Sequence, residues 1–181
     1  MDHPKPIAAA LALVCITCLS FASAAEEPAA REPLTKPGDS FVSLQVEGCA
    51  DKCPSFEIVV FDTGRITFRS NNSYTSEKGV AFKNGMRAIH GRIEKYLQDS
   101  GAFSPPADCT GATSDPTVVT VQSVRDSGTQ EASWSSGCAN QVEKARAIAK
   151  VFVNESGTRR MINSDTRYWE KYWETWKYPE Q

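Results

Sequence analysis

The chain has 181 residues, which is enough for one domain and little more. Its 20 Lys and Arg residues nearly balance its 22 Asp and Glu residues, and the formal net charge is −2. A near-neutral chain lacks the basic footprint of a nucleic-acid-binding protein or of a protein that binds an anionic membrane surface. We therefore expect neither nucleic acid nor an anionic membrane surface as a partner.

The N-terminus is typical of a secretory signal peptide. Lys5 lies in a short basic region, and an uninterrupted apolar run follows from Ile7 to Ile16. The small residues Ala22, Ser23 and Ala24 then fit a signal-peptidase site. We predict that residues 1–24 are removed and that the remainder is periplasmic or secreted.

A membrane anchor is the alternative interpretation of this N-terminus. The uncharged stretch from Pro6 to Ala25 has the length that a spanning helix needs. Its second half, however, contains Thr17 and Ser20 and ends in the small-x-small pattern of a cleavage site. Cleavage is therefore preferred, and no transmembrane segment is expected in the chain that remains.

Four cysteines remain after the predicted cleavage: Cys49, Cys53, Cys109 and Cys138. An even number of cysteines in an exported chain favours two disulfides, for which three connectivities exist. We predict Cys49–Cys53 and Cys109–Cys138, because the first pair flanks one turn and the second pair brackets one hairpin.

Three strands are predicted in the first third of the domain. Residues 41–47 alternate between apolar and polar, whereas residues 56–61 are nearly all apolar and therefore predict a central strand covered on both faces. The turn at 62–64 ends in a glycine, and residues 66–68 continue into a third strand. The polar stretch after it allows a short fourth strand around Tyr74.

A helix is predicted next, with Asn84 as its N-cap and Gly101 at its end. Its apolar stripe consists of Met86, Ile89, Ile93, Tyr96 and Leu97.

The second half of the chain predicts a hairpin and another helix. The strands cover 117–125 and 129–134, joined by a turn that contains Gly128. Asn140 and Glu143 have the spacing of a capping box at the start of the helix. Its buried stripe consists of Val142, Ala145, Ala149 and Phe152.

These elements predict an α+β domain with a mostly antiparallel sheet and helices on one face. The predicted order is strand, strand, strand, helix, strand, strand, helix, followed by an aromatic C-terminal helix. The domain plan is a signal peptide at 1–24, a flexible tether at 25–40, the α+β domain at 41–157 and a C-terminal aromatic helical segment at 158–181.

The segment from Cys49 to Phe56, Cys-Ala-Asp-Lys-Cys-Pro-Ser-Phe, lies between two strands and precedes the Gly64 turn. In this order of elements the chain resembles a domain-of-unknown-function family of small bacterial envelope proteins with a strand, Cys-x-x-x-Cys-Pro, strand signature. The resemblance extends from about Phe41 to Val153. It implies secretion and a compact α+β domain, and it implies no catalytic residues. Cys109 and Cys138 fall outside the shared motif.

The Cys49/Cys53 pair has two interpretations. Copper(I) selects soft thiolates, and Cys49, Cys53 and Pro54 match the Cys-x-x-x-Cys-Pro motif of Sco-type copper chaperones. Those proteins have a thioredoxin-like fold and a histidine ligand, whereas a strand follows the motif here. A structural disulfide is therefore preferred, and thiol-redox or copper(I) handling is the alternative.

His90 is the single histidine outside the signal peptide, and it lies on the first predicted helix. Metal catalysis needs about three protein ligands, which one histidine supplies poorly. No Gly-x-Ser-x-Gly elbow and no phosphate-binding glycine loop is present. We expect no metal site, no cofactor and no catalytic residue, and we interpret His90 as a boundary or core residue on that helix.

The C-terminus is rich in large aromatic residues. On a helix from about 165 to 177 they form one stripe: Tyr168, Trp169, Tyr172, Trp173 and Trp176. This helix either docks on its own domain or forms a surface for a partner, a membrane interface or a glycan, because Trp and Tyr dominate recognition hot spots. Docking is the preferred interpretation, and Trp169, Tyr172, Trp173 and Trp176 are the candidate partner-binding residues.

Together these features predict an exported, non-catalytic domain that acts as an envelope interaction or binding module. The partner is a protein or another envelope component that the sequence does not specify.

The first prediction concerns the signal peptide. Protein recovered from the cell envelope or the medium is expected to start near Ala25, because the Ala22-Ser23-Ala24 site lies directly before it. Intact-mass measurement and N-terminal sequencing check this start. Retention of residues 1–24 in the exported protein would show that the segment is an anchor.

Overall fold

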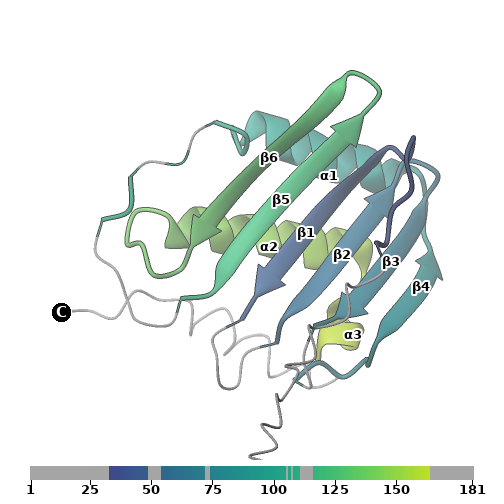
Figure 1. Ribbon diagram of the computed structural model, residues 1–181, viewed down its shortest axis with the longest axis horizontal. Helices are drawn as coiled ribbons and strands as arrows, with labels where there is room; N and C mark the ends of the chain where they lie inside the picture. The colour runs from purple at the N-terminus through teal and green to yellow at the C-terminus, as the bar shows by residue number, and fades with distance from the viewer. Residues whose placement is uncertain are drawn as a thin grey trace, which may run out of the picture. The chain divides into compact units, whose positions relative to one another are not determined.

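The computed structural model describes residues 33–48, 54–71, 74–104, 106, 108–110 and 116–163. In them, an antiparallel sheet carries helices on one of its faces (Figure 1). The strands are β1 (Phe41–Glu47), β2 (Phe56–Phe61), β3 (Arg65–Ser70), β4 (Val80–Asn84), β5 (Val118–Arg125) and β6 (Gly128–Ser135). The helices are α1 (Ala88–Asp99), α2 (Val142–Ser156) and α3 (Arg159–Ile162).

The sheet has the order β4-β3-β2-β1-β5-β6, and every neighbouring pair is antiparallel. This confirms the α+β class and the antiparallel sheet. The predicted order of elements lacks two that the structure contains, β4 before α1 and the short α3 after α2. The fourth strand begins at Val80, farther along the chain than Tyr74, around which the sequence allowed one.

The central strand β2 is buried on both faces, as its apolar sequence predicts. Phe56, Ile58 and Val60 face the helices, and Val59 and Phe61 face the other side. On that other side, Leu34 packs against the small cluster that Val59 and Phe61 form with Phe41. The last part of the predicted tether, residues 33–40, therefore contacts the domain in the structure.

Helix α1 buries Ile89, Ile93 and Leu97, which confirms the prediction that these three residues face the core. Its predicted start is wrong: Asn84 is the last residue of β4, and the side chain of Met86 is 67% exposed. The helix begins only at Ala88, so Met86 lies before the buried stripe.

Gly101 ends α1 with the geometry that glycine favours. Its φ is 61°, its amide donates to the carbonyl of Gln98 at 3.0 Å, and the Ala102 amide donates to the carbonyl of Leu97 at 2.8 Å. These two bonds form a Schellman motif, in which a residue with positive φ satisfies the last carbonyls of a helix. The predicted helix end is confirmed.

Helix α2 buries the predicted residues Val142, Ala145, Ala149 and Phe152, together with Ile148 and Val153. The predicted capping box is wrong, because the N-cap residue is Gln141 and no side chain caps the helix. The side chain of Asn140 instead accepts a hydrogen bond from the Thr110 amide and donates to the carbonyl of Asp108. The side chain of Asn140 therefore bonds to residues distant in the sequence and does not cap the helix.

The short helix α3 attaches the end of the described chain to the segment before β4. The amides of Ser76 and Glu77 donate to the carbonyls of Ile162 and Met161, at 3.0 and 2.7 Å. Ile162 is fully buried in the core beneath the sheet. The last described residues thus lie close to the start of β4 (Figure 1).

The turn between β2 and β3 requires glycine. Gly64 has φ of 90°, and a Cβ atom there would lie 2.6 Å from the Gly85 carbonyl oxygen. We predict that Gly64→Ala lowers the free energy of unfolding by about 3 kcal/mol, since backbone strain and a backbone clash combine. Urea unfolding followed by circular dichroism measures the loss.

Gly38→Ala is the matched control for this variant. Gly38 has nearly the same φ, 86°, but no atom lies within 4 Å of its added Cβ. Gly38→Ala should lower the free energy of unfolding by only about 1–2 kcal/mol, the cost of the left-handed conformation alone. Equal losses for the two variants would contradict the role of the close approach at Gly85.

Candidate functional site

Two of the predicted candidate sites lie outside the described residues. Cys49 and Cys53 belong to the connection between β1 and β2, of which the structure describes only Gly48, Pro54 and Ser55. The C-terminal aromatic residues also fall outside, namely Trp169, Tyr172, Trp173 and Trp176. Their disulfide, docking and partner-binding roles stay predictions.

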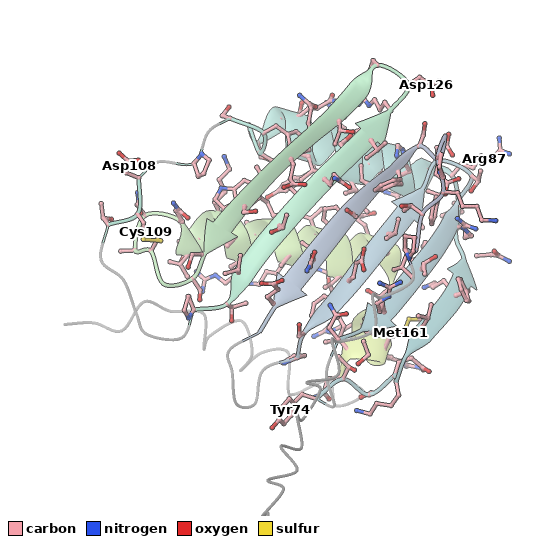
Figure 2. All side chains as sticks on the ribbon, in the orientation of Figure 1. Tyr74, Arg87, Asp108, Cys109, Asp126 and Met161 are labelled. Atoms are coloured by element: carbon pink, nitrogen blue, oxygen red, sulfur yellow. A yellow bond between two sulfur atoms is a disulfide. The ribbon has the colours of Figure 1, made fainter. Side chains whose placement is uncertain are left out.

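The second predicted disulfide is present. Cys109 and Cys138 are bonded across a sequence separation of 29 residues (Figure 2). The bond joins the segment before β5 to the segment after β6, and the Ala139 amide donates to the carbonyl of Thr110 beside it. Together with the two hydrogen bonds of Asn140, the bond holds residues 108–110 against the start of α2. This pair therefore has a structural role.

His90 lies at the boundary between α1 and the sheet, as predicted. Its Nδ1 is 4.0 Å from Glu94 Oε2, and its Nε2 is buried without a partner among the described residues. Glu94 Oε1 accepts hydrogen bonds from the Arg125 guanidinium and, at 3.3 Å, from the Ser123 hydroxyl. The group ties α1 to β5.

This group does not have the geometry of a serine hydrolase. Nucleophilic catalysis requires the serine hydroxyl to donate to the imidazole that will take its proton. Here Ser123 donates to Glu94, and no described hydrogen bond joins Ser123 to His90. The carboxylate satisfies a buried hydroxyl and an arginine, which is an ordinary structural task.

In the described part of the chain, no group of three or more His, Cys, Asp or Glu side chains is placed to hold a metal ion. Among the same residues, no helix combines the length and the apolar character that crossing a bilayer requires.

The face of the sheet opposite the helices carries polar side chains over the middle of β1, β5 and β6, beside the apolar cluster to which Phe41 of β1 and Val124 of β5 belong. Gln45, Thr120 and Ser133 are neighbours across the three strands, and so are Ser43, Gln122 and Glu131. These six residues are named the polar face below. Their neighbours along the strands point the other way into the core, for example Leu44, Val121 and Ala132.

Five side chains of the polar face make hydrogen bonds, four of them to one another and Gln45 to the neighbouring Glu47. The Thr120 and Ser133 hydroxyls are 2.8 Å apart, and Gln122 Nε2 donates to Glu131 Oε2 at 3.2 Å. Gln45 Nε2 donates to Glu47 Oε1 at 3.0 Å. The face is therefore an ordered array of hydroxyl, amide and carboxylate groups, with donors and acceptors still accessible.

Two hollows lie at the edges of this architecture. One, of about 300 Å³, is lined by Leu97, Gln98, Gly101, Phe103, Ser104 and Gln130. The other, of about 280 Å³, is lined by Gly38, Asp39, Ser40, Phe61, Asp62, Thr63 and Arg65. In the second hollow Arg65 stacks on the Phe61 ring and lies 3.6 Å from Asp39, so its guanidinium is already engaged.

The edge strand β4 is a surface that the sequence interpretation missed. Val80 and Phe82 are 44% and 69% exposed, and Met86 follows them at 67%. The sequence Val-Ala-Phe-Lys-Asn does not alternate between apolar and polar residues, whereas its burial does, with Val80, Phe82 and Asn84 exposed. A β-branched and an aromatic residue favour a strand there, but only the three-dimensional structure shows which side is covered.

The disulfide gives a quantitative prediction. Cys109→Ser should lower the free energy of unfolding by about 3.5 kcal/mol, because the bond closes a loop of about 30 residues in the unfolded chain. The Cys109 side chain is exposed, so little packing is lost with it. Urea unfolding under oxidising conditions measures the change.

Cys53→Ser is the comparison for this variant. The predicted Cys49–Cys53 bond closes a loop of only five residues, for which the same model gives about 2 kcal/mol. A larger loss for Cys53→Ser than for Cys109→Ser would refute the loop-length ranking.

Comparison with models of known protein families and with curated proteins finds no match for this chain. The resemblance to the envelope family through the Cys49–Pro54 motif accordingly stays a prediction. The function has to be inferred from the chain's own surfaces.

Proposed function

We propose that this chain is an exported, non-catalytic binding module that contacts an envelope protein through the polar face of its sheet. The Cys109–Cys138 disulfide supports the export, because such bonds persist in oxidising compartments. The near-neutral charge supports a partner other than nucleic acid.

The polar face is the observation that carries this proposal. Gln45, Glu131 and Ser133 are exposed on it, and both helices that build the core lie on the opposite side. Rigid strands hold these side chains, so that binding a partner would immobilise few additional rotors. A preorganised array of hydrogen-bonding groups is suited to recognition, since such an interface needs about one hydrogen bond per 100–200 Å².

The arrangement of titratable groups supports a non-catalytic role. The nearest approach to a catalytic constellation, His90 with Glu94 and Ser123, is occupied in tying α1 to β5. The alternative of thiol-redox or copper(I) handling rests on the spacing of Cys49 and Cys53, which lie outside the described residues.

The proposal predicts that a charged double variant of the polar face loses partner binding. Gln45→Arg with Ser133→Arg places two large cations on either side of Thr120. Both native side chains are exposed, so the melting temperature should be unchanged within a few degrees. Capture of the partner from envelope extract, quantified by mass spectrometry, should fall at least tenfold.

Gln98→Arg with Asp99→Arg is the matched control, because both residues are exposed on α1, on the opposite side of the sheet. This control should capture the same partner as the unmodified protein. If the polar-face variant and the control capture equal amounts, the polar face is not the recognition surface.

A further inference from the structure

The backbone of β4 is unpaired on its outer side among the described residues. The Ser70 amide donates to the carbonyl of Gly79, and the Gly85 amide donates to the carbonyl of Gly64, so the backbone groups of Gly79 and Gly85 face β3. In an antiparallel strand this direction alternates from residue to residue. The amides and carbonyls of Val80, Phe82 and Asn84 therefore point away from the sheet, which ends at β4.

The side chains of this edge do not protect it. Soluble proteins commonly place lysine, another charge or proline on an exposed edge strand to prevent pairing. Lys83 is the one charged residue of β4, and its ammonium group donates to the Gly157 carbonyl on the helical side. Val80 and Phe82 remain as exposed apolar side chains.

The opposite edge of the sheet differs. The Ser136 amide faces β5, where it donates to the Thr117 carbonyl, so the residues of β6 with outward backbone groups are Thr129, Glu131, Ser133 and Ser135. All four are polar, and Glu131 adds a charge. The sequence protects one edge of the sheet and leaves the other open.

We propose that β4 pairs antiparallel with β4 of a second copy of this chain, about a twofold axis beside Phe82. In this register Phe82 lies opposite Phe82 of the second copy, and Val80 lies opposite Asn84. All three residues have outward backbone groups, so each pair can exchange two hydrogen bonds. The two sheets then form one continuous sheet, with the helices of both copies on the same side.

The charges beyond the strand ends are complementary in the same register. In this register the segment before β4, which contains Glu77, lies beside the segment after β4 of the second copy, which contains Arg87. Glu77 and Arg87 are exposed, and neither side chain has an ion pair among the described residues. Arg87 projects away from the sheet at the end of β4 (Figure 2). By symmetry the ion pair forms twice, which argues for a second copy over an unrelated partner.

The size of the surface sets the expected strength. A standard interface buries about 800 Å² on each partner, and a large aromatic side chain contributes 150–250 Å² at most. Val80, Phe82 and Met86 together supply less than a standard interface, so the dimer should dissociate at micromolar concentrations, with Kd of roughly 10–100 μM.

Sedimentation equilibrium of the full mature chain between about 1 μM and 1 mM tests the proposal. The unmodified protein should change from monomer to dimer across this range, and Phe82→Glu should weaken the dimer at least tenfold by placing two carboxylates at the axis. Thr129→Glu on the β6 edge is the control, because Thr129 is exposed and lies outside the polar face, and this variant should dimerise normally. A monomer at 1 mM, or a dimer that Phe82→Glu leaves unchanged, would overturn the proposal.

A charge exchange at the strand ends tests the register and does not depend on the folding of the Phe82 variant. Glu77→Arg alone should weaken dimerisation at low salt several-fold, and so should Arg87→Glu alone. The double variant with both changes restores opposite charges and should recover the affinity of the unmodified protein. If the double variant is weaker than both single variants, the proposed register is wrong. The polar face is unaltered in all these variants, so their outcome does not bear on partner binding there.

Discussion

The helices α1 and α2 bury their apolar stripes against the same face of the sheet, and the other features of the domain depend on this one-sided packing. Ile93, Leu97, Ile148 and Phe152 are fully buried there against β1, β2 and their neighbours. Because successive side chains of a strand point to opposite faces of the sheet, every second residue of each strand lies on the face without helices. That side carries polar residues over the middle of β1, β5 and β6, and Leu34 and Val124 pack on the small apolar cluster that Phe41, Val59 and Phe61 form there.

The contacts between the helices keep this layer in register with the sheet. The Arg92 guanidinium of α1 lies 2.6 Å from the Glu155 carboxylate of α2, and Lys144 of α2 donates to the Gly101 carbonyl at the end of α1. At exposed positions such pairs stabilise weakly, so their main effect is on orientation. The apolar stripes supply most of the free energy, and the polar contacts select one arrangement of the helices.

Sequence patterns predicted the elements whose signal is local. The alternation in β1, the apolar run of β2 and the Gly64 turn all depend on neighbouring residues, and each matches the structure. The failures involve contacts distant in the sequence. Asn140 was predicted as a cap, but residues 108 and 110 take up its hydrogen-bonding groups. The candidate sites followed the same division: the Cys109–Cys138 pair was predictable from its position around a hairpin, whereas neither the polar face nor the open edge of β4 could be recognised before the strand order was known.

The position of β1 in the sheet has a consequence for the order of folding. β1 begins at Phe41 and pairs on one side with β2, which follows it directly, but its other neighbour, β5, begins only at Val118. A chain that emerges from its N-terminus can form the β1–β4 meander early, with one side of β1 still lacking hydrogen-bond partners. β1 becomes enclosed on both sides only when β5 arrives, and this distant pairing makes closure entropically slow. Until then the nascent domain exposes a hydrophobic edge in its middle, so its protection against aggregation depends on how soon the second half of the chain follows the first.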